Sequence, residues 1–271
     1  MSHLFNFFNN GTSGGGGGGG VPTGRLELDI NPAIGAFQDI QQNTPCTNNT
    51  AVESLQNQGD NFAFLQSTGS RKPTWFAASS AQNNKPYLEF DEDYMISSGG
   101  TPLFTLRSQD CTFYAVVKGA SSAGTWDTLL EKDNDWFWDD GWRLATDSQE
   151  DWVTNVGGGG QSENRIDNTN TVTFQAEIYT LRFRASTTPY INSTFSTWSI
   201  GYTVTGTTTG FASKATPAQQ IIFGTSRDSS GSGVSSFRWN GQVFRILGYS
   251  ECHSESTLQS TITTLKTIYG I

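Results

Sequence analysis

The chain has 271 residues, of which 35% are hydrophobic and 15% are charged. This length fits one large all-β domain, and the polar, glycine-rich composition is typical of short strands joined by polar turns rather than of a helical bundle. The formal net charge of −9 disfavours nucleic acids and anionic membranes as partners, because its long-range field would repel phosphate groups. No apolar run approaches the ~20 residues that a membrane helix needs, so we expect no membrane insertion.

Residues 1–24 differ in composition from the rest of the chain. Residues 1–10 are rich in aromatic residues and asparagine, and residues 11–24 form a linker that contains the glycine run Gly14 to Gly20. Such a run has maximal backbone freedom and buries no side chains, so it predicts a flexible tether. The start lacks the basic and apolar regions of a conventional secretory signal, and we expect it to be retained.

The tether carries an apolar tip of four large side chains within five residues. In water this tip would be a liability, whereas insertion into a groove on another subunit would remove substantial apolar area from solvent. We therefore interpret the tip as an anchoring peptide, the alternative being a start without fixed structure. The anchoring residues are Leu4, Phe5, Phe7 and Phe8.

The rest of the chain reads as a series of strands. Leu26–Ile30 alternates between apolar and polar residues, and Phe62–Gln66 and Phe113–Val117 are short apolar runs suited to the interior of a sandwich. Thr171–Arg184 alternates over fourteen residues and predicts one long strand or two strands separated by a bend. Trp198–Thr205 predicts another strand.

The last part of the chain predicts a strand followed by a helix. Gly241–Tyr249 carries apolar residues on both faces, as expected for a strand that is covered on each side. Ser254 or Ser256 can cap the helix, with Gln259 completing a capping box with Ser256. An apolar stripe at i, i+4 and i+7 predicts a helix of about three turns that ends at Gly270. The stripe consists of Leu258, Ile262 and Leu265.

Several segments resemble the concanavalin A-like, laminin-G-like domains of the lectin/glucanase superfamily. Asn84-Lys-Pro-Tyr-Leu-Glu-Phe-Asp-Glu-Asp-Tyr94 resembles their "N-x-P-x-L-x-F-D-G" strand and turn, with Glu92 where many members carry glycine. The ending Lys266-Thr-Ile-Tyr-Gly-Ile271 resembles their "L-x-x-K-Y-G-I" close. Three further segments resemble the proline segment and core strands of the family, namely Arg71–Trp75, Thr128–Lys132 and Gln219–Gly224.

One carboxylate pair raises an enzymatic alternative, because retaining glucanases of this broad fold use an "E-x-D-x-x-E" strand. Alternation places Glu27 and Asp29 on one face, and a retaining pair must lie about 5–5.5 Å apart across the sugar. The third carboxylate is missing, because Asn31 and Pro32 follow. We therefore predict no catalytic residues here and interpret the segment as a first or edge strand with exposed acids.

A stretch rich in tryptophan and aspartate suggests a binding surface. Indole faces stack on the C–H faces of sugars while carboxylates accept hydrogen bonds from hydroxyls, so this composition favours glycan or partner binding. The same acids could coordinate calcium, although they lack the EF-hand spacing, and we expect some of the indoles to pack in the core. The candidate residues are Trp126, Trp136, Trp138, Asp139, Asp140, Trp142 and Trp152.

The remaining chemistry-bearing residues form no motif. The only histidines are His3 and His253, and we interpret Cys252-His253 as a polar turn. Cys46, Cys111 and Cys252 lack the paired spacing of a zinc site, and their odd number favours a reducing site of synthesis. We predict no metal site and no cofactor.

The resemblance implies an antiparallel jelly-roll β-sandwich over residues 25–271, with one short C-terminal helix, behind an anchoring arm of residues 1–24. Together with the arm, it implies a non-enzymatic virion protein of a tailed bacteriophage, namely a capsid decoration, head fibre or tail component that assembles in the host cytoplasm. The expected partners are other virion proteins, host-surface glycans and further copies in a homo-oligomer. The alternatives are a glycan-cleaving enzyme of the same fold and a lectin-like module of a cellular adhesin.

Overall fold

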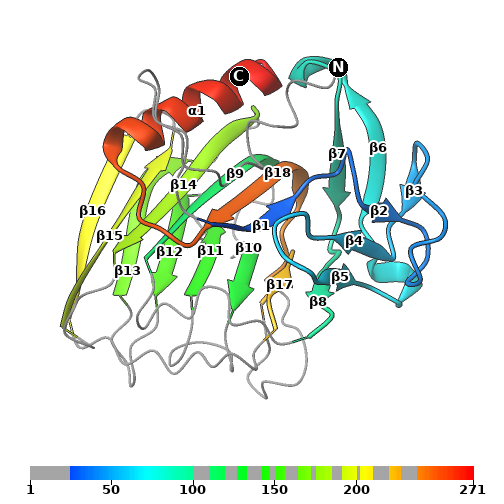
Figure 1. Ribbon diagram of the computed structural model, residues 1–271, viewed down its shortest axis with the longest axis horizontal. Coiled ribbons are helices and arrows are strands. Elements are labelled where there is room, and N and C mark those ends of the chain that lie inside the picture. Colours follow the sequence, from blue (N-terminus) through cyan, green and yellow to red (C-terminus); the bar gives the residue numbers. More distant parts are fainter. Residues whose placement is uncertain are drawn as a thin grey trace.

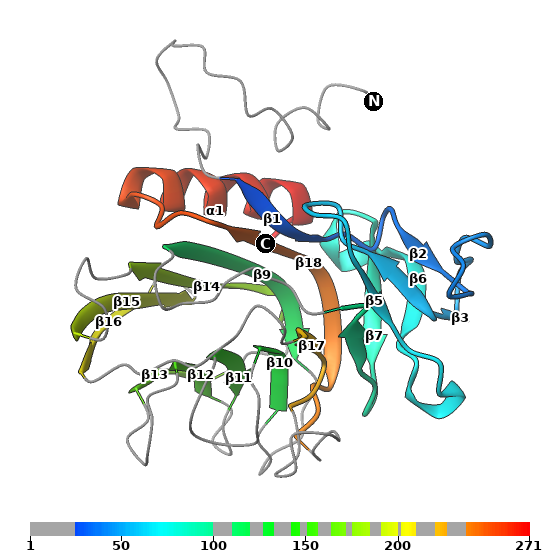
Figure 2. The same cartoon turned by 60° about the horizontal axis from the view of Figure 1, so that its bottom comes forward.

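The computed structural model describes residues 25–99, 110–119, 127–132, 142–146, 151–156, 164–171, 175–184, 191–199, 202–209, 220–226 and 237–271. In this part of the chain, two antiparallel β-sheets pack face to face and one α-helix covers the outer face of one sheet (Figure 1 and Figure 2). The fold is a jelly-roll β-sandwich with one C-terminal helix, as the sequence predicted.

Strand β18, the last strand in the sequence, lies near the middle of sheet A. In spatial order this sheet consists of β16 (Tyr202–Thr209), β15 (Ile191–Ser199), β14 (Glu177–Arg184), β9 (Cys111–Gly119), β18 (Gly241–Tyr249), β7 (Lys85–Phe90), β6 (Thr74–Ser79) and β3 (Thr50–Ala51). Strand β1 (Leu26–Ile30) pairs with the second half of β18. It lies along the same edge of β18 as β7, which pairs with the first residues of β18. Strand β18 has the bounds that the alternation predicted.

Sheet B forms the other layer of the sandwich. In spatial order it consists of β13 (Asn164–Thr171), β12 (Asp151–Val156), β11 (Trp142–Thr146), β10 (Asp127–Lys132), β17 (Ile222–Phe223), β8 (Met95–Ser97), β5 (Ala63–Leu65), β4 (Ser54–Gln56) and β2 (Ala36–Phe37). The adjacent strands β10 and β11 of this sheet are buried along their whole length.

Two of the stretches that alternation predicted as strands each contain parts of two strands in the structure. The fourteen-residue stretch from Thr171 to Arg184 contains the last residue of β13 and all of β14, which belong to different sheets. The stretch from Trp198 to Thr205 contains the end of β15 and the start of β16, which pair antiparallel. Alternation continues across such a connection, so it could not show where one strand ends.

Alternation along sheet A creates two apolar layers. On β9, Phe113, Ala115 and Val117 point into the inter-sheet core, between sheets A and B, whereas Tyr114 and Val116 point toward the helix. Figure 2 shows the resulting order of helix, sheet A and sheet B. We call the second layer the α1 layer; its buried members are Tyr114, Val116, Ala176, Ile178, Phe244, Leu247, Tyr249, Leu258, Ile262, Leu265 and Tyr269.

Helix α1 (Glu255–Tyr269) is held at both ends by capping residues. The Ser254 hydroxyl accepts a hydrogen bond from the Thr257 amide at 3.2 Å, and Gly270 takes the left-handed conformation with φ of 69°. Ser254 is therefore the N-cap. The predicted capping box with Gln259 is wrong, because this side chain donates to the Glu255 carboxylate at 2.9 Å. With 15 residues, the helix is about one turn longer than expected.

Large aromatic rings fill the inter-sheet core. Trp152 from β12 stacks on Tyr179 from β14 with ring centroids 4.3 Å apart, and on Trp239 at 5.6 Å. Trp142 from β11 packs against Phe113 from β9 at 4.8 Å. Because each pair except that with Trp239 joins sheet B to sheet A, these rings fasten the two layers to each other.

Candidate functional sites

The predicted glycan surface falls partly outside the described residues. Trp126, Trp136, Trp138, Asp139 and Asp140 lie there, and their placement stays a prediction. The two remaining candidates lie in the inter-sheet core, where Trp142 is 1% and Trp152 is 0% exposed. Such buried indoles offer no free face to a sugar, so for Trp142 and Trp152 the structure favours the packing interpretation over ligand binding.

The strand register separates the candidate residues along β10. At one end of this strand, Lys132 pairs with Trp142, and the connection of residues 133–141 joins these two residues in the sequence. At the other end, Asp127, which follows Trp126 directly, pairs with Thr146. Six strand residues span about 17 Å. Residues 133–141, which carry four of the candidates, therefore follow one end of β10 in the sequence, whereas Trp126 precedes the other end.

The acids of β1 are buried, which corrects the expectation of exposed acids. Glu27 is 8% and Asp29 is 5% exposed. The register shift between Leu26 and Leu28 interrupts the alternation at Glu27, so the two carboxylates do not share one environment. Burial raises the pKa of the Glu27 carboxyl, against weaker opposing effects of a Ser250 hydrogen bond and the charge of Arg25.

Asp29 is held in a bidentate ion pair with Arg245 of β18. The Arg245 Nε lies 2.6 Å from Asp29 Oδ1, and Nη2 donates to Oδ2 at 2.7 Å. Burial raises the pKa of the Asp29 carboxyl, and the Arg245 guanidinium opposes this shift. Both Asp29 oxygens thus lie against one guanidinium, with a hydrogen bond at Oδ2 and an ion-pair contact at Oδ1, and the pair joins β1 to β18.

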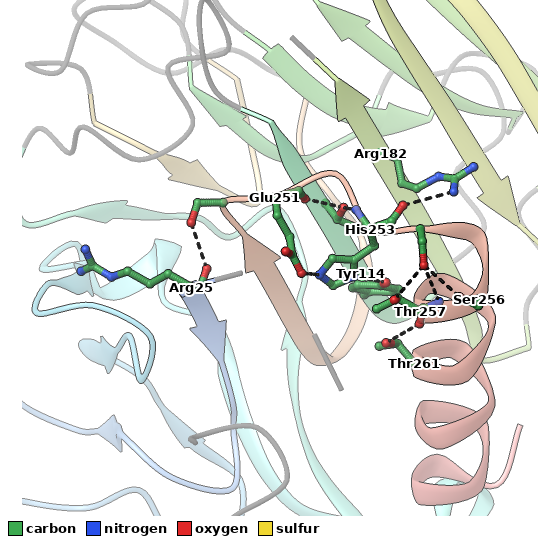
Figure 3. A network of polar contacts seen from close by, with 11 residues as sticks. Arg25, Tyr114, Arg182, Glu251, His253, Ser256, Thr257 and Thr261 are labelled. Atoms are coloured by element: carbon green, nitrogen blue, oxygen red, sulfur yellow. Dashed lines mark hydrogen bonds and ion pairs between the residues drawn. The ribbon is translucent and has the colours of Figure 1, made fainter. Parts of the chain in front are cut away.

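A buried polar chain lies between sheet A and the start of α1 (Figure 3). Tyr114 from β9 places its hydroxyl 2.6 Å from His253 Nδ1, and His253 Nε2 lies 3.1 Å from Glu251 Oε1, an ion-pair contact whose alignment falls short of a hydrogen bond. The Thr112 hydroxyl accepts from the His253 amide at 2.9 Å and donates to the Glu251 carbonyl at 2.8 Å. These contacts fasten the segment that links β18 to the helix.

The electrostatics of this chain favour a neutral imidazole. Burial lowers the pKa of His253 to about 4, the Glu251 carboxylate opposes this shift, and the charge of Arg182 adds to it. Burial also raises the pKa of the Tyr114 phenol. The acid beside Nε2 favours the tautomer that carries its proton there, so that Nδ1 accepts from the Tyr114 hydroxyl.

Sequence reasoning missed this site. Cys252-His253 was interpreted as a polar turn, but His253 is 2% exposed. Its ring also lies 4.6 Å from that of Tyr249, the last residue of β18. The available signal was the placement of a tyrosine, Tyr114, within the apolar run of β9, because a buried phenol needs a polar partner.

A second polar cluster surrounds the turn after β7. Glu92, which stands where the resembling family often has glycine, takes the left-handed conformation with φ of 59°. Its carboxylate accepts from Arg238 at 3.0 Å and from Arg71 at 3.3 Å. Burial raises the pKa of the neighbouring Asp93 carboxyl to about 6, despite a hydrogen bond from the Asp91 amide. This turn keeps a backbone shape that glycine favours and uses the side chain to tie two segments together.

Other predicted features are placed as follows. The anchoring residues Leu4, Phe5, Phe7 and Phe8 lie outside the described residues. Within the described ranges, no three His, Cys, Asp or Glu side chains gather in a way that could hold a metal ion. No helix in that same part of the chain has the length and apolar character needed to cross a membrane. All three cysteines are free thiols, with Cys111 buried.

No protein-family model matches the chain, and no curated protein sequence is similar to it. Among solved structures, a Trypanosoma rangeli sialidase in complex with 2,3-difluorosialic acid superposes with a TM-score of 0.52 at 11% identity, over 93% of this chain and 35% of the sialidase. At this identity the likeness concerns the fold alone.

Two smaller solved domains are also similar to the chain. The CBM40 of a Ruminococcus gnavus sialidase, bound to α2,3-sialyllactose, gives a TM-score of 0.48 at 13% identity, over 65% of this chain and 95% of the module. The binding domain of botulinum neurotoxin DC, in complex with SialylT, gives a TM-score of 0.49 at 10% identity, over 89% of this chain and 52% of that domain. The chain thus spans about half of the toxin domain and about a third of the parasite sialidase.

Proposed function

We propose that this protein is a non-enzymatic, lectin-like structural component of a tailed bacteriophage virion, which binds host-surface glycans through residues 133–141. The observation that carries the glycan part is the position of this connection. It links two adjacent, fully buried strands of a lectin-like sandwich and holds Trp136, Trp138, Asp139 and Asp140 in one short segment. Indoles and carboxylates are the side chains that sugar rings and hydroxyls need.

The engagement of Asp29 supports a role without catalysis. Glycoside hydrolysis by a retaining mechanism needs two carboxyl groups facing each other across a sugar. Asp29 instead has both oxygens in contact with Arg245, and Glu27 is buried in a different environment. Of the carboxylate pair that the sequence offered for hydrolysis, Asp29 is thus committed to joining two strands, and Glu27 is buried.

The arm supports assembly into a larger particle. The apolar tip of Leu4, Phe5, Phe7 and Phe8 at the end of a glycine tether suits insertion into a neighbouring subunit, and other virion proteins in an oligomer are the proposed neighbours. Deleting residues 1–20 tests this part. Particles assembled with the truncated protein should lose it, and full occupancy without the arm would contradict anchoring.

A glycan array tests the binding part. The full chain should bind a subset of glycans, and Trp138→Ala should reduce that binding about fivefold or more, because stacking of one indole on a sugar is worth about 1 kcal/mol or more. Trp126→Ala is the matched control, since Trp126 precedes the opposite end of β10 and should leave binding unchanged. Equal loss in both variants, or an array without any bound glycan, would contradict the assignment.

A further inference from the structure

The hydrogen-bond pattern of the polar chain under helix α1 matches a neutral imidazole at His253. A neutral imidazole offers one N–H and one lone pair, and these match the Glu251 carboxylate at Nε2 and the Tyr114 hydroxyl at Nδ1. A second proton would place an N–H at Nδ1, opposite the phenolic O–H at 2.6 Å. The phenol oxygen could accept from this N–H only if the phenol turned its own hydrogen elsewhere, so the donor and acceptor would have to exchange roles.

The surroundings of the ring offer little compensation for an added charge. The His253 side chain is 0% exposed, so water does not reach an imidazolium there. Around the ring, β9 contributes Tyr114, β18 contributes Tyr249, and the following loop contributes Glu251 as the one anion in contact. Strand β14 contributes the cation Arg182.

Arg182 also ties the polar chain to the helix. Its Nη1 donates to the His253 carbonyl at 3.3 Å, while Nη2 forms an ion pair with Glu255, the first residue of α1, at 2.9 Å. Glu255 is thus already paired with a cation and does not neutralise an imidazolium. Next to it, Ser254 caps the helix directly after His253, so any displacement of His253 acts on the first turn of α1.

We propose that the Tyr114–His253–Glu251 chain is an acid-sensitive latch that holds the start of helix α1 against sheet A. At neutral pH the uncharged imidazole bridges β9 and the loop before the helix. In acid the imidazole takes up a second proton at Nδ1, the hydrogen bond that the Tyr114 hydroxyl donates there is lost, and the first turns of α1 separate from the sheet to bring the buried charge into water, while the inter-sheet core stays folded. The latch acts independently of glycan binding and of anchoring.

Hydrogen exchange of the intact chain tests the latch. The background variant His3→Ala leaves His253 as the only histidine, so a histidine titration can be assigned to it. If the opened state restores an ordinary imidazole, protection of the first α1 amides, relative to an unstructured peptide, should fall about 20-fold between pH 7 and pH 5. Amides of β10 and β11 in sheet B should keep their protection.

A non-titrating variant provides the matched comparison. His253→Gln keeps one N–H donor and one oxygen acceptor but cannot become charged in this range. Its α1 amides should show constant protection from pH 7 to pH 5, and the same 20-fold fall in this variant would overturn the proposal. Glu251→Gln removes the one anion in contact with the imidazole, so a buried imidazolium is compensated still less, and the opening of α1 should move to higher pH.

A spectroscopic measurement keeps the test decisive if His253→Gln does not fold. The imidazole of labelled His253 in the His3→Ala protein should titrate well below the ordinary histidine pKa, together with the loss of protection in α1. A titration near the ordinary value with α1 still protected would overturn the latch. So would a low titration midpoint that α1 protection does not follow.

Discussion

The two apolar layers on either side of sheet A are built differently. The inter-sheet core relies on broad ring contacts, such as the stack of Trp152 on Tyr179. The α1 layer combines aliphatic contacts with directed hydrogen bonds, since Tyr269 donates to the Phe244 carbonyl at 3.3 Å and Tyr114 contacts His253. Ring contacts supply area without fixing one position, whereas hydrogen bonds define where a helix rests. The comparison suggests that the core supplies most of the stability and that polar contacts position the helix.

The largest expected effect comes from the inter-sheet core. Trp152→Ala should lower the free energy of unfolding by about 3–5 kcal/mol, because a fully buried indole that touches both sheets leaves a large cavity. Denaturant unfolding followed by circular dichroism measures this loss. Trp152→Phe keeps part of the ring volume and should lose less. A loss below about 1 kcal/mol for the alanine variant would break the comparison, since the core would then not dominate.

A smaller and more local effect is expected in the α1 layer. Thr112→Val removes a hydroxyl that bonds the Glu251 carbonyl and the His253 amide, and leaves the buried His253 amide without this acceptor, which costs about 1–3 kcal/mol. Hydrogen exchange should show the first turn of α1 opening more often while β10 and β11 stay protected. Thr112→Ser keeps the hydroxyl and is the control. Uniform loss of protection in both sheets would show that the two layers unfold as one unit.

The smallest effect is expected at the turn after β7, which belongs to neither layer. Glu92→Gly relieves a left-handed residue but removes exposed ion pairs to Arg71 and Arg238, so the net change should stay within about 1 kcal/mol. Glu92→Ala removes the same ion pairs and keeps the strained backbone. Thermal unfolding should therefore rank the glycine variant above the alanine variant, and the reverse order would exclude strain at this position.

Features with local causes could be predicted from the sequence. The bounds of β18 follow from alternation, and the end of α1 at Gly270 follows from the conformation that a helix stop requires. Contacts between distant residues could not be predicted in this way. Asp29 looked like an exposed acid because its partner Arg245 is 216 residues away.

The same limit applies to the candidate sites. His253 looked like part of a turn because Tyr114 lies 139 residues earlier in the chain. Trp142 and Trp152 could not be separated from Trp136 and Trp138 on composition, because only the strand register shows which indoles enter the core. The sequence shows which charged and aromatic side chains the chain carries. The pairing of distant strands decides which of these side chains are buried and which stay accessible to a ligand.

The position of β18 also constrains how the protein is made. Its neighbours in sheet A, β9 and β7, are translated more than a hundred residues earlier, yet they are joined only through β18. Until residue 249 has left the ribosome, a nascent chain would expose unpaired edges of β9, β7 and β1 where this strand belongs. Completion of the sheet is therefore a late event in synthesis, and chains interrupted before residue 241 would be substrates for chaperones or proteases rather than smaller folded proteins.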